Sequence, residues 1–441
     1  MRRISTYAEG EAYLLGLIDE TVSRRTSYKL DRIRALLFEL GDPHRAYPTI
    51  HVGGTSGKGS TATMIAGALQ AAGKRTGLHT KPHLRAMTER ARIDGAPIPH
   101  ERFAALLDEM LPAIARAAAQ HGRPTYYETL LALAFKYFAD ERVDVAVIEV
   151  GLGGRLDGTN VILPVVAAIT SVGYDHTDVL GTTIEAIASE KAGIAKPGVP
   201  LVLAAMPAAA LAVIERYASE IGAPIVRVEQ VVRIERERAE ERGAQRLSVV
   251  TPRGSYRLRL AVAGAFQRTN AATAIAVLEQ LADELRPRPE EIAAALRDVA
   301  IPGRMELVCA SPTVVFDVAH NAEKAESLVA SLREWFPHRR IHYVVAIGES
   351  KDARRIIEIL GTVNSTFTFT SFVAAGRKAI LPQRLATLAE SLGAWGRAIT
   401  DPVEALTVAR RRAAIDDVVV VTGSTFVVAG LREWYVPTAV P

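Results

Sequence analysis

A glycine-rich loop with a single lysine constrains this fold more than any other part of the sequence. The loop reads Gly54-Thr55-Ser56-Gly57-Lys58-Gly59-Ser60, between a short apolar run at 49–52 and an alanine-rich stretch at 61–72. Strand, glycine loop and helix in this order form a phosphate cradle, because backbone N–H groups and the positive helix end face the ligand. We therefore predict that the loop binds a polyphosphate and that Lys58 reaches its β- and γ-phosphates. The strict P-loop pattern has Ser or Thr directly after the lysine, whereas Gly59 stands there in this chain.

The rest of the chain alternates between helical and strand-like patterns. The first forty residues are predicted to be helical, with the helix ending at Gly41-Asp42-Pro43. Further helices are predicted at 103–119, 129–138, 183–192, 264–281 and 290–297, and strands at 49–52, 143–150, 165–170 and 200–205. Strands that are apolar throughout and alternate with helices indicate a mostly parallel sheet covered on both faces. The sequence thus predicts an α/β fold.

A charged stretch and a boundary divide the chain. Residues 225–262 are rich in Arg and Glu and predict a small β-rich insertion. Ile301-Pro302-Gly303 is the predicted domain boundary, which gives a larger domain at 1–300 and a smaller one at 301–441. In the second domain, strands are expected at 313–317, 342–347, 366–372 and 418–422, with helices between them.

Composition excludes several classes of protein. With 49% hydrophobic and 23% charged residues, the 441-residue chain is neither disordered nor fibrous. The net charge of +4 is spread along the chain, so a nucleic-acid partner is not expected. Cys309 is the only cysteine, which rules out an internal disulfide and a multi-thiolate zinc site. The N-terminus has no apolar signal core and no stretch approaches about 18 apolar residues, so we expect a cytoplasmic protein without a membrane partner.

Glu149 ends an apolar strand and begins a glycine turn. Ligands bind at the carboxyl ends of strands in such sheets. Read alone, this carboxylate could equally be a surface residue or a capping partner. Beside a phosphate loop, it is better interpreted as a ligand of Mg²⁺, which prefers hard oxygen donors. The following Gly151-Leu152-Gly153-Gly154 lacks the spacing of a dinucleotide fingerprint, so a Rossmann cofactor site is rejected.

A series of motifs in a fixed order resembles one family. The motifs that follow the phosphate loop begin with 82–84, 89–90 and the distinctive block 149–157 with Thr159-Asn160. The later motifs are Asp175-His176, 190–194, Gln267, 270–271, 302–304, Asp317-x-Ala319-His320-Asn321 and 422–424. In this order they resemble the folylpolyglutamate synthase and dihydrofolate synthase family of Mur-type ligases. The resemblance implies a P-loop ATPase domain with a mostly parallel sheet, followed by a smaller Rossmann-like α/β domain that binds glutamate.

The resemblance also implies roles for individual residues. Asn270, Arg304 and Asn321 would contact ATP together with residues 54–60, that is Gly54, Thr55, Ser56, Gly57, Lys58, Gly59 and Ser60. Glu149 and His176 would hold one Mg²⁺. Lys191, read without the family as a solvated lysine, would be carbamylated and hold a second Mg²⁺. Tyr127, Arg155 and Asp157 would bind the folate-type acceptor, and Asp317, His320 and Ser424 the incoming L-glutamate.

The activity implied is ATP-dependent amide formation. A carboxylate of folate or dihydropteroate would attack the γ-phosphate, and the amine of L-glutamate would then displace phosphate from the acyl phosphate. Lys58, His176, Lys191, Asp317 and His320 would carry this chemistry, in a protein expected to be a monomer. Two alternatives stay open: a Mur-type ligase that uses a different acid, and a non-catalytic nucleotide-binding protein.

The chain departs from the family at one notable position. The family usually has Ser-Pro-His-Leu, in which the serine is a magnesium ligand, whereas this chain has Lys81-Pro82-His83-Leu84. A protonated lysine has no lone pair to donate to a metal. We expect the Lys81 ammonium to contact the ATP phosphates instead. Ser56, where the family commonly has Asn, is a milder departure.

Overall fold

The computed structural model describes residues 3–18, 29–239, 243–374 and 377–435. The chain divides into two compact units. The first comprises Met1–Glu235, Ser248–Leu258 and Thr269–Arg297, and the second comprises Arg236–Leu247, Arg259–Arg268 and Asp298–Pro441. The sequence-based domain boundary at residue 301 stays a prediction.

An eight-stranded sheet forms the centre of the first unit. Its central strands are parallel, and every residue of the two innermost strands, β1 and β5, is buried, as expected where helices cover both faces. The two short edge strands β3 and β4 are antiparallel. In spatial order the strands are β4 (Ala96–Pro97), β3 (Arg92–Ile93), β2 (Thr76–His79), β5 (Val145–Glu149), β1 (Thr49–Gly53), β6 (Val166–Ile169), β7 (Leu201–Leu203) and β8 (Ile225–Arg227).

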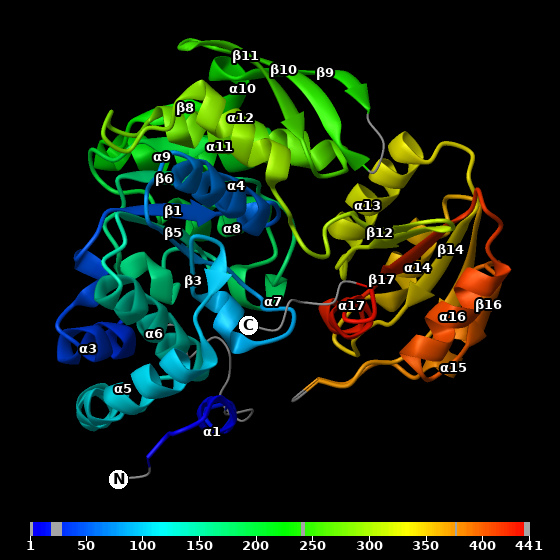
Figure 1. Cartoon of the computed structure of the whole chain (residues 1–441), viewed down its shortest axis with the longest axis horizontal. Coiled ribbons are helices and arrows are strands. Elements are labelled where there is room, and N and C mark those ends of the chain that lie inside the picture. Colours follow the sequence, from blue (N-terminus) through cyan, green and yellow to red (C-terminus); the bar gives the residue numbers. More distant parts are fainter. Residues whose placement is uncertain (1–2, 19–28, 240–242, 375–376, 436–441) are drawn as a thin grey trace. The chain divides into compact units, whose positions relative to one another are not determined.

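Helices cover both faces of this sheet. Figure 1 shows α4, α11 and α12 on one side and α3, α5 and α6 on the other. The helices are α1 (Tyr7–Leu15), α3 (Asp31–Glu39), α4 (Lys58–Ala71), α5 (His100–His121), α6 (Tyr126–Asp140), α7 (Thr177–Leu180), α8 (Ile184–Ala192), α9 (Ala208–Ile221), α10 (Val228–Val231), α11 (Ala265–Glu279) and α12 (Pro289–Asp298), with short 3₁₀ turns η1 (Pro43–Arg45), η2 (Met87–Arg90) and η3 (Gly158–Val161).

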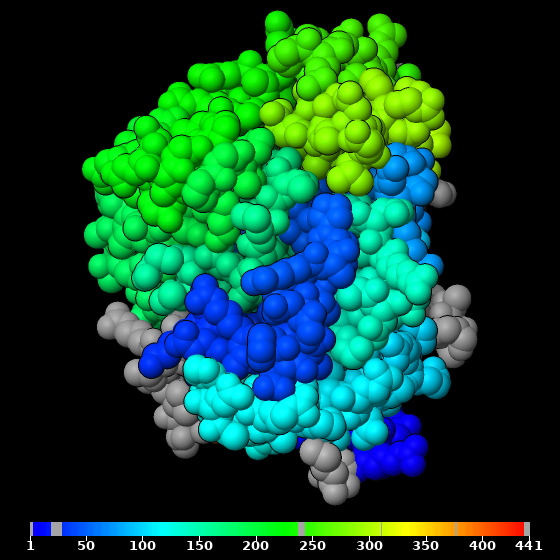
Figure 2. Space-filling view, turned by 90° about the vertical axis from the view of Figure 1, so that its left-hand side faces the viewer, coloured from blue at the N-terminus to red at the C-terminus, as the bar shows by residue number. Residues whose placement is uncertain are grey.

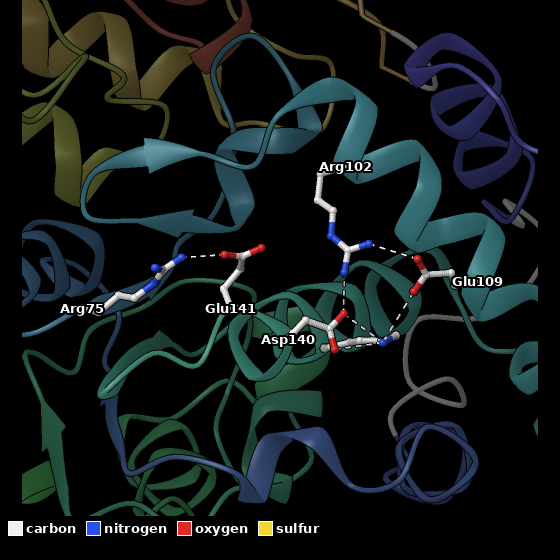
Figure 3. Close-up of polar contacts among 6 residues, drawn as sticks. Arg75, Arg102, Glu109, Asp140 and Glu141 are labelled. Atoms are coloured by element: carbon white, nitrogen blue, oxygen red, sulfur yellow. Dashed lines mark hydrogen bonds and ion pairs between the residues drawn. The ribbon is translucent and has the colours of Figure 1, made fainter.

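Large apolar side chains of the first unit's core lie between α5, α6 and the sheet. Phe103, Phe135, Phe138 and Ile148 are fully buried in one cluster. On the face shown in Figure 2, the blue segment that leads into β1 lies beside the cyan surface of α5. At the surface, Arg102 of α5 pairs with Asp140 at the end of α6 at 2.6 Å (Figure 3). Such exposed pairs add little stability, so the apolar cluster is what places α6 on the sheet.

The predicted β-rich insertion is present, but it begins later than expected. Its three-stranded sheet has the order β11 (Gly254–Leu260), β10 (Gln245–Thr251) and β9 (Arg233–Ala239). The predicted start at residue 225 was wrong, because Ile225–Arg227 pairs with β7 as the edge strand of the first sheet.

A six-stranded sheet forms the centre of the second unit, as the second α/β alternation predicted. All neighbouring strands are parallel except β12, which is antiparallel to β13. In spatial order they are β12 (Glu306–Ala310), β13 (Thr313–Phe316), β17 (Val418–Thr422), β14 (Ile341–Val345), β15 (Ser365–Phe369) and β16 (Gly396–Ala398). The helices are α13 (Ala322–Trp335), α14 (Ala353–Leu360), α15 (Pro382–Ser391), α16 (Pro402–Arg412) and α17 (Thr425–Arg432).

None of the helices in the described part of the chain combines the length and the apolar character needed to cross a bilayer.

Candidate active site at the carboxyl ends of the strands

The glycine loop connects β1 to α4 and requires glycine at two positions. Gly54 and Gly57 have φ values of 139° and 85°, which L side chains rarely adopt. A Cβ on Gly54 would lie 2.2 Å from Thr170 Oγ1, and one on Gly57 would lie 2.4 Å from Asn270 Oδ1. The side chain of Asn270 on α11 therefore lies directly against the phosphate loop, where the sequence predicted a nucleotide contact.

Two residues that the sequence reasoning missed hold the loop in place. The backbone N–H of Ser56 donates to Ser171 Oγ at 2.8 Å, and the Thr170 hydroxyl donates to the Ser56 carbonyl at 2.5 Å. Thr55 N–H donates to the Ser171 carbonyl at 2.9 Å. Both residues directly follow β6, the neighbour of β1. The sequence signal that could have found them was their position at the carboxyl end of the predicted strand 165–170.

Lys58 begins α4 and lies folded over its own loop. Its Nζ donates to the carbonyl oxygens of Gly54 at 2.8 Å and Thr55 at 3.0 Å. The ammonium is thus held within the loop, at the positive end of a 14-residue helix. This arrangement concentrates positive charge where a polyphosphate would bind.

The carboxylate of Glu149 lies against the first turn of α4. Glu149 ends β5 and is 3% exposed. A Cβ on Gly59 would lie 3.2 Å from its Oε2, and the same oxygen accepts a hydrogen bond from the backbone N–H of Lys81 at 2.9 Å. A buried carboxylate beside a phosphate loop supplies the hard oxygen donor that Mg²⁺ prefers, so this residue fits the predicted metal role.

The other two predicted metal ligands lie on separate elements. His176 follows β6, with φ of 51° and 35% of its side chain exposed. Lys191 lies in the last turn of α8 and is 3% exposed. Within residues 3–18, 29–239, 243–374 and 377–435, no three or more His, Cys, Asp or Glu side chains are grouped as a metal site. The set of Glu149, His176 and Lys191 stays a prediction.

A buried polar network holds the glycine-rich turn after β5. Asp157 accepts hydrogen bonds from the Leu152 N–H at 2.7 Å, the Thr159 hydroxyl at 2.6 Å and the Tyr127 hydroxyl at 3.3 Å. Since Thr159 gives its one proton to Asp157, His51 Nε2, at 2.8 Å, is the donor to Thr159. Burial lowers the pKa of His51 to about 3, which keeps that ring neutral. Asp157 thus has a structural role, and acceptor binding by Asp157 and Tyr127 stays a prediction.

Two residues tie this turn to the end of α8 that carries Lys191. The Arg155 guanidinium pairs with Glu190 at 2.6 Å. Asn160 Nδ2 donates to the carbonyl of Gly193 at 3.0 Å. Arg155 therefore has a partner on α8, and its predicted contact with the acceptor is untested.

In the second unit, two loops meet at the carboxyl ends of the parallel neighbours β13 and β17. Asp317, 6% exposed, accepts hydrogen bonds from the N–H groups of Met305 and Ala319, both at 2.9 Å. Burial raises the pKa of this carboxyl group against those bonds and the Arg304 charge. The Gly423 N–H donates to the Ala319 carbonyl at 2.9 Å. The fold therefore brings the predicted glutamate residues Asp317, His320 and Ser424 onto adjoining loops.

His320 is neutral and surrounded by cations. Its Nδ1 donates to the Val318 carbonyl at 2.8 Å, which leaves Nε2 as an acceptor 3.4 Å from Lys324 Nζ. Burial, followed by Lys324 and then Lys351 and Arg304, lowers the pKa of His320 to about 3. This cluster of positive charge suits an anionic ligand.

Asn321 caps α13 with its side-chain oxygen, whereas its side-chain nitrogen has no acceptor among the described residues. Its Oδ1 accepts a hydrogen bond from the Lys324 N–H at 3.0 Å. Its Nδ2 is buried, and no group in the described part of the chain accepts a hydrogen bond from it. A buried amide donor of this kind can donate to a ligand oxygen, and the contact of Asn321 with the nucleotide stays a prediction.

Comparisons with known proteins identify the family of this chain. A model of the Mur ligase middle domain matches residues 52–278, and a model of the Mur ligase, glutamate ligase domain matches residues 303–425. The dihydrofolate synthase/folylpolyglutamate synthase of Bacillus subtilis is 36% identical over 410 residues, which are 92% of this chain and 94% of that protein.

Two solved structures show the same architecture. Mycobacterium tuberculosis folylpolyglutamate synthase complexed with ADP has a TM-score of 0.87 and 31% identity, and the match covers 98% of both chains. Escherichia coli FolC in complex with DHPP and ADP has a TM-score of 0.84 and 29% identity, and the match covers 98% of this chain and 99% of that one. From its domains, its relatives and its fold, the chain belongs to the folylpolyglutamate synthase/dihydrofolate synthase family of Mur ligases.

Proposed function

We propose that this protein is an ATP-dependent ligase that joins L-glutamate to the carboxylate of a folate or dihydropteroate. The observation that carries the proposal is the phosphate loop, in which Lys58, Asn270 and Glu149 converge on the start of α4. Binding of ADP by the M. tuberculosis relative, and of ADP and DHPP by the E. coli relative, supports the same ligands here.

The first step activates the acid. A carboxylate oxygen of the acceptor attacks the γ-phosphorus of ATP, the bond to the β-phosphate oxygen breaks, and ADP leaves. The Lys58 ammonium and the N–H groups of the loop stabilise the charge that develops on the phosphoryl oxygens. Arg304 would add a further cation.

The second step forms the amide. The glutamate amine attacks the acyl carbon, and inorganic phosphate leaves. His320 Nε2 is an acceptor that faces Lys324 Nζ at 3.4 Å, and with glutamate bound it would instead accept a hydrogen bond from the amine and orient it. Lys324 and Lys351 provide positive charge for the glutamate carboxylates. Asp317 holds one of the two loops through the N–H groups of Met305 and Ala319, and Asp317 and Ser424 would contact the glutamate.

Magnesium fits the residues around the phosphate loop. Glu149 is buried beside the loop, and we propose that it holds Mg²⁺ with His176, and that a carbamate on Lys191 holds a second ion. Mg²⁺ would neutralise phosphate charge during transfer. A carbamate converts the buried cation of Lys191 into an anionic oxygen donor. Formation of the carbamate needs a neutral amine.

The test of the function is phosphate release with L-glutamate and a panel of acids. We expect release with dihydropteroate or a reduced folate, and none when either glutamate or the acid is omitted. Release with a non-folate acid alone would instead support a Mur-type ligase of different specificity. No release with any acid would favour a nucleotide-binding protein without ligase activity. Sedimentation at assay concentration tests the expected monomer.

The carbamate has its own test. Wild-type protein in ¹³C-bicarbonate should give a carbamate carbonyl signal, and Lys191→Ala should remove that signal. Lys191→Ala should also lose activity, and added bicarbonate should not restore it. Lys196→Ala is the matched control. Lys196 is a nearby lysine whose pKa burial lowers, and its variant should keep the signal. A signal that survives Lys191→Ala, or a fully active Lys191→Ala, contradicts the assignment.

A further inference from the structure

A histidine that the proposed chemistry does not use lies at the end of β2. His79 is 0% exposed, and its Nδ1 lies 2.8 Å from the carbonyl oxygen of Arg90. A carbonyl can only accept, so Nδ1 carries the proton. Burial foremost, and then the Arg90 charge, lowers the pKa of His79 to about 4, so the ring is neutral and Nε2 is bare.

The Nε2 atom, which has no hydrogen-bond donor among the described residues, makes a histidine at this position destabilising. Nε2 is buried, and no group in residues 3–18, 29–239, 243–374 or 377–435 donates a hydrogen bond to it. A buried polar atom without a partner destabilises a protein, whereas an apolar side chain of similar size would not. The hydrogen bond from Nδ1 to the Arg90 carbonyl is the contact that the histidine ring provides and an apolar side chain would not.

That bond closes a loop of twelve residues, 80–91, which connects β2 to β3. At one end of this loop the Lys81 N–H donates to Glu149 Oε2 at 2.9 Å. Within it, the N–H groups of Leu84 and Arg85 donate to the Glu89 carboxylate, both at 2.9 Å. The 80–91 loop is thus internally bonded and joined to the phosphate site at its beginning.

At the other end of the loop, the Arg90 side chain contacts α6. Its Nε donates to His83 Nδ1 at 2.9 Å, and its guanidinium carbon lies 5.7 Å from the centre of the Tyr126 ring. The next residue, Tyr127, has its ring centre 6.5 Å from that of His79. Arg90 therefore lies among groups next to the residue assigned to the acceptor acid.

We propose that His79 is a positioning residue, which holds the Arg90 carbonyl through Nδ1 and thereby fixes the 80–91 loop beside Tyr126 and Tyr127. Its effect on the acceptor rests on the proposed function, whereas its effect on the loop does not.

Two amide variants distinguish the roles of the two ring nitrogens. The side-chain amide of Asn places an N–H close to the position of Nδ1, so His79→Asn keeps a donor for the Arg90 carbonyl. The longer Gln places its amide near Nε2, so His79→Gln loses that donor. Both variants remove the ring and its packing. Because Asn is the smaller of the two, a role in packing alone predicts that His79→Asn is at least as harmful as His79→Gln, whereas the positioning role predicts that His79→Gln is the more harmful.

Hydrogen exchange and trypsin cleavage test the loop without any substrate. In His79→Gln we expect amides 81–90 to exchange about tenfold faster, and cleavage after the exposed Arg85 to accelerate similarly, since opening follows the loss of one buried hydrogen bond. His79→Asn should stay within about twofold of wild type. Unchanged exchange of α4 shows that the fold is intact. Equal rates in both variants overturn the proposal.

Kinetics then test the acceptor. If the wild-type enzyme ligates glutamate to a folate-type acid, His79→Gln should raise the KM for that acid about tenfold while kcat and the KM for ATP stay near normal. If His79→Gln does not fold, Arg90→Met removes the contacts to His83 and Tyr126 and should raise the same KM. A wild-type enzyme without ligase activity would refute the proposed function alone, because the exchange experiment still decides the role of His79.

Discussion

At the scale of single residues, Lys58 is the cation on which phosphoryl transfer depends. Lys58→Ala removes the ammonium that lies over the loop carbonyls, and loss of one such group typically lowers the rate by about 10²–10³. Steady-state phosphate release measures the effect. Lys136→Ala, which removes an ion-paired lysine from the outer surface of α6, should keep normal kcat. A Lys58→Ala enzyme with near-normal kcat would contradict the phosphate-loop assignment.

Lys81 is the residue at which this chain departs from its family. Its backbone N–H holds Glu149, so Lys81→Ser keeps that bond while it replaces an ammonium with a hydroxyl donor. A positive charge beside a metal site repels the ion, so we expect Lys81→Ser to need less Mg²⁺ for half-saturation and to change the KM for ATP. Lys81→Met separates the loss of charge from the gain of a hydroxyl. Identical Mg²⁺ and ATP titrations in all three proteins would show that the side chain faces solvent.

At the scale of elements, the contact between the phosphate loop and the end of β6 sets the shape of the nucleotide site. Thr170→Val removes the hydroxyl that donates to the Ser56 carbonyl and lies 3.1 Å from the Gly53 carbonyl. Loss of a buried hydrogen bond costs about 1 kcal/mol, so the KM for ATP should rise about five- to tenfold. Thr170→Ser keeps the hydroxyl and should behave like wild type. An unchanged KM in Thr170→Val would mean that the glycines alone shape the loop.

The elements also show what sequence can and cannot predict. The glycine loop, the apolar strands β1 and β5 and the strand-end position of Glu149 follow from local patterns, and the structure has them. The hydroxyls of Thr170 and Ser171 and the bond between Lys81 and Glu149 depend on residues 68 to 115 positions apart, which no local pattern reveals. The short edge strands β3, β4 and β16 were missed because two or three residues carry too little periodicity.

At the scale of the whole molecule, buried neutral histidines make stability depend on pH. Burial lowers the pKa to about 3 in His51 and His320 and to about 4 in His79 and His83. The unfolded chain binds these protons near pH 6.5 and the folded chain does not. The free energy of unfolding is therefore complete above pH 6.5 and falls as the pH drops towards 4.

Urea unfolding between pH 7.5 and pH 5 measures this dependence. Each histidine contributes a slope of up to about 1.4 kcal/mol per pH unit, in a range above the titration of ordinary carboxylates. His79→Asn should reduce the slope by about one proton. A free energy of unfolding that is flat across this range would contradict the burial of these rings.

The path of the chain between the two units limits how the gene can be divided. Helix α11 is continuous across the division at Arg268 and Thr269, and the segments 236–247 and 259–268 belong to the second unit although they precede the end of the first. A fragment that stops at Arg297 would carry those segments without their unit, and the remaining fragment would lack them. Neither half is thus an autonomous expression product, and a chimera that exchanges one unit for that of a relative needs several coordinated junctions.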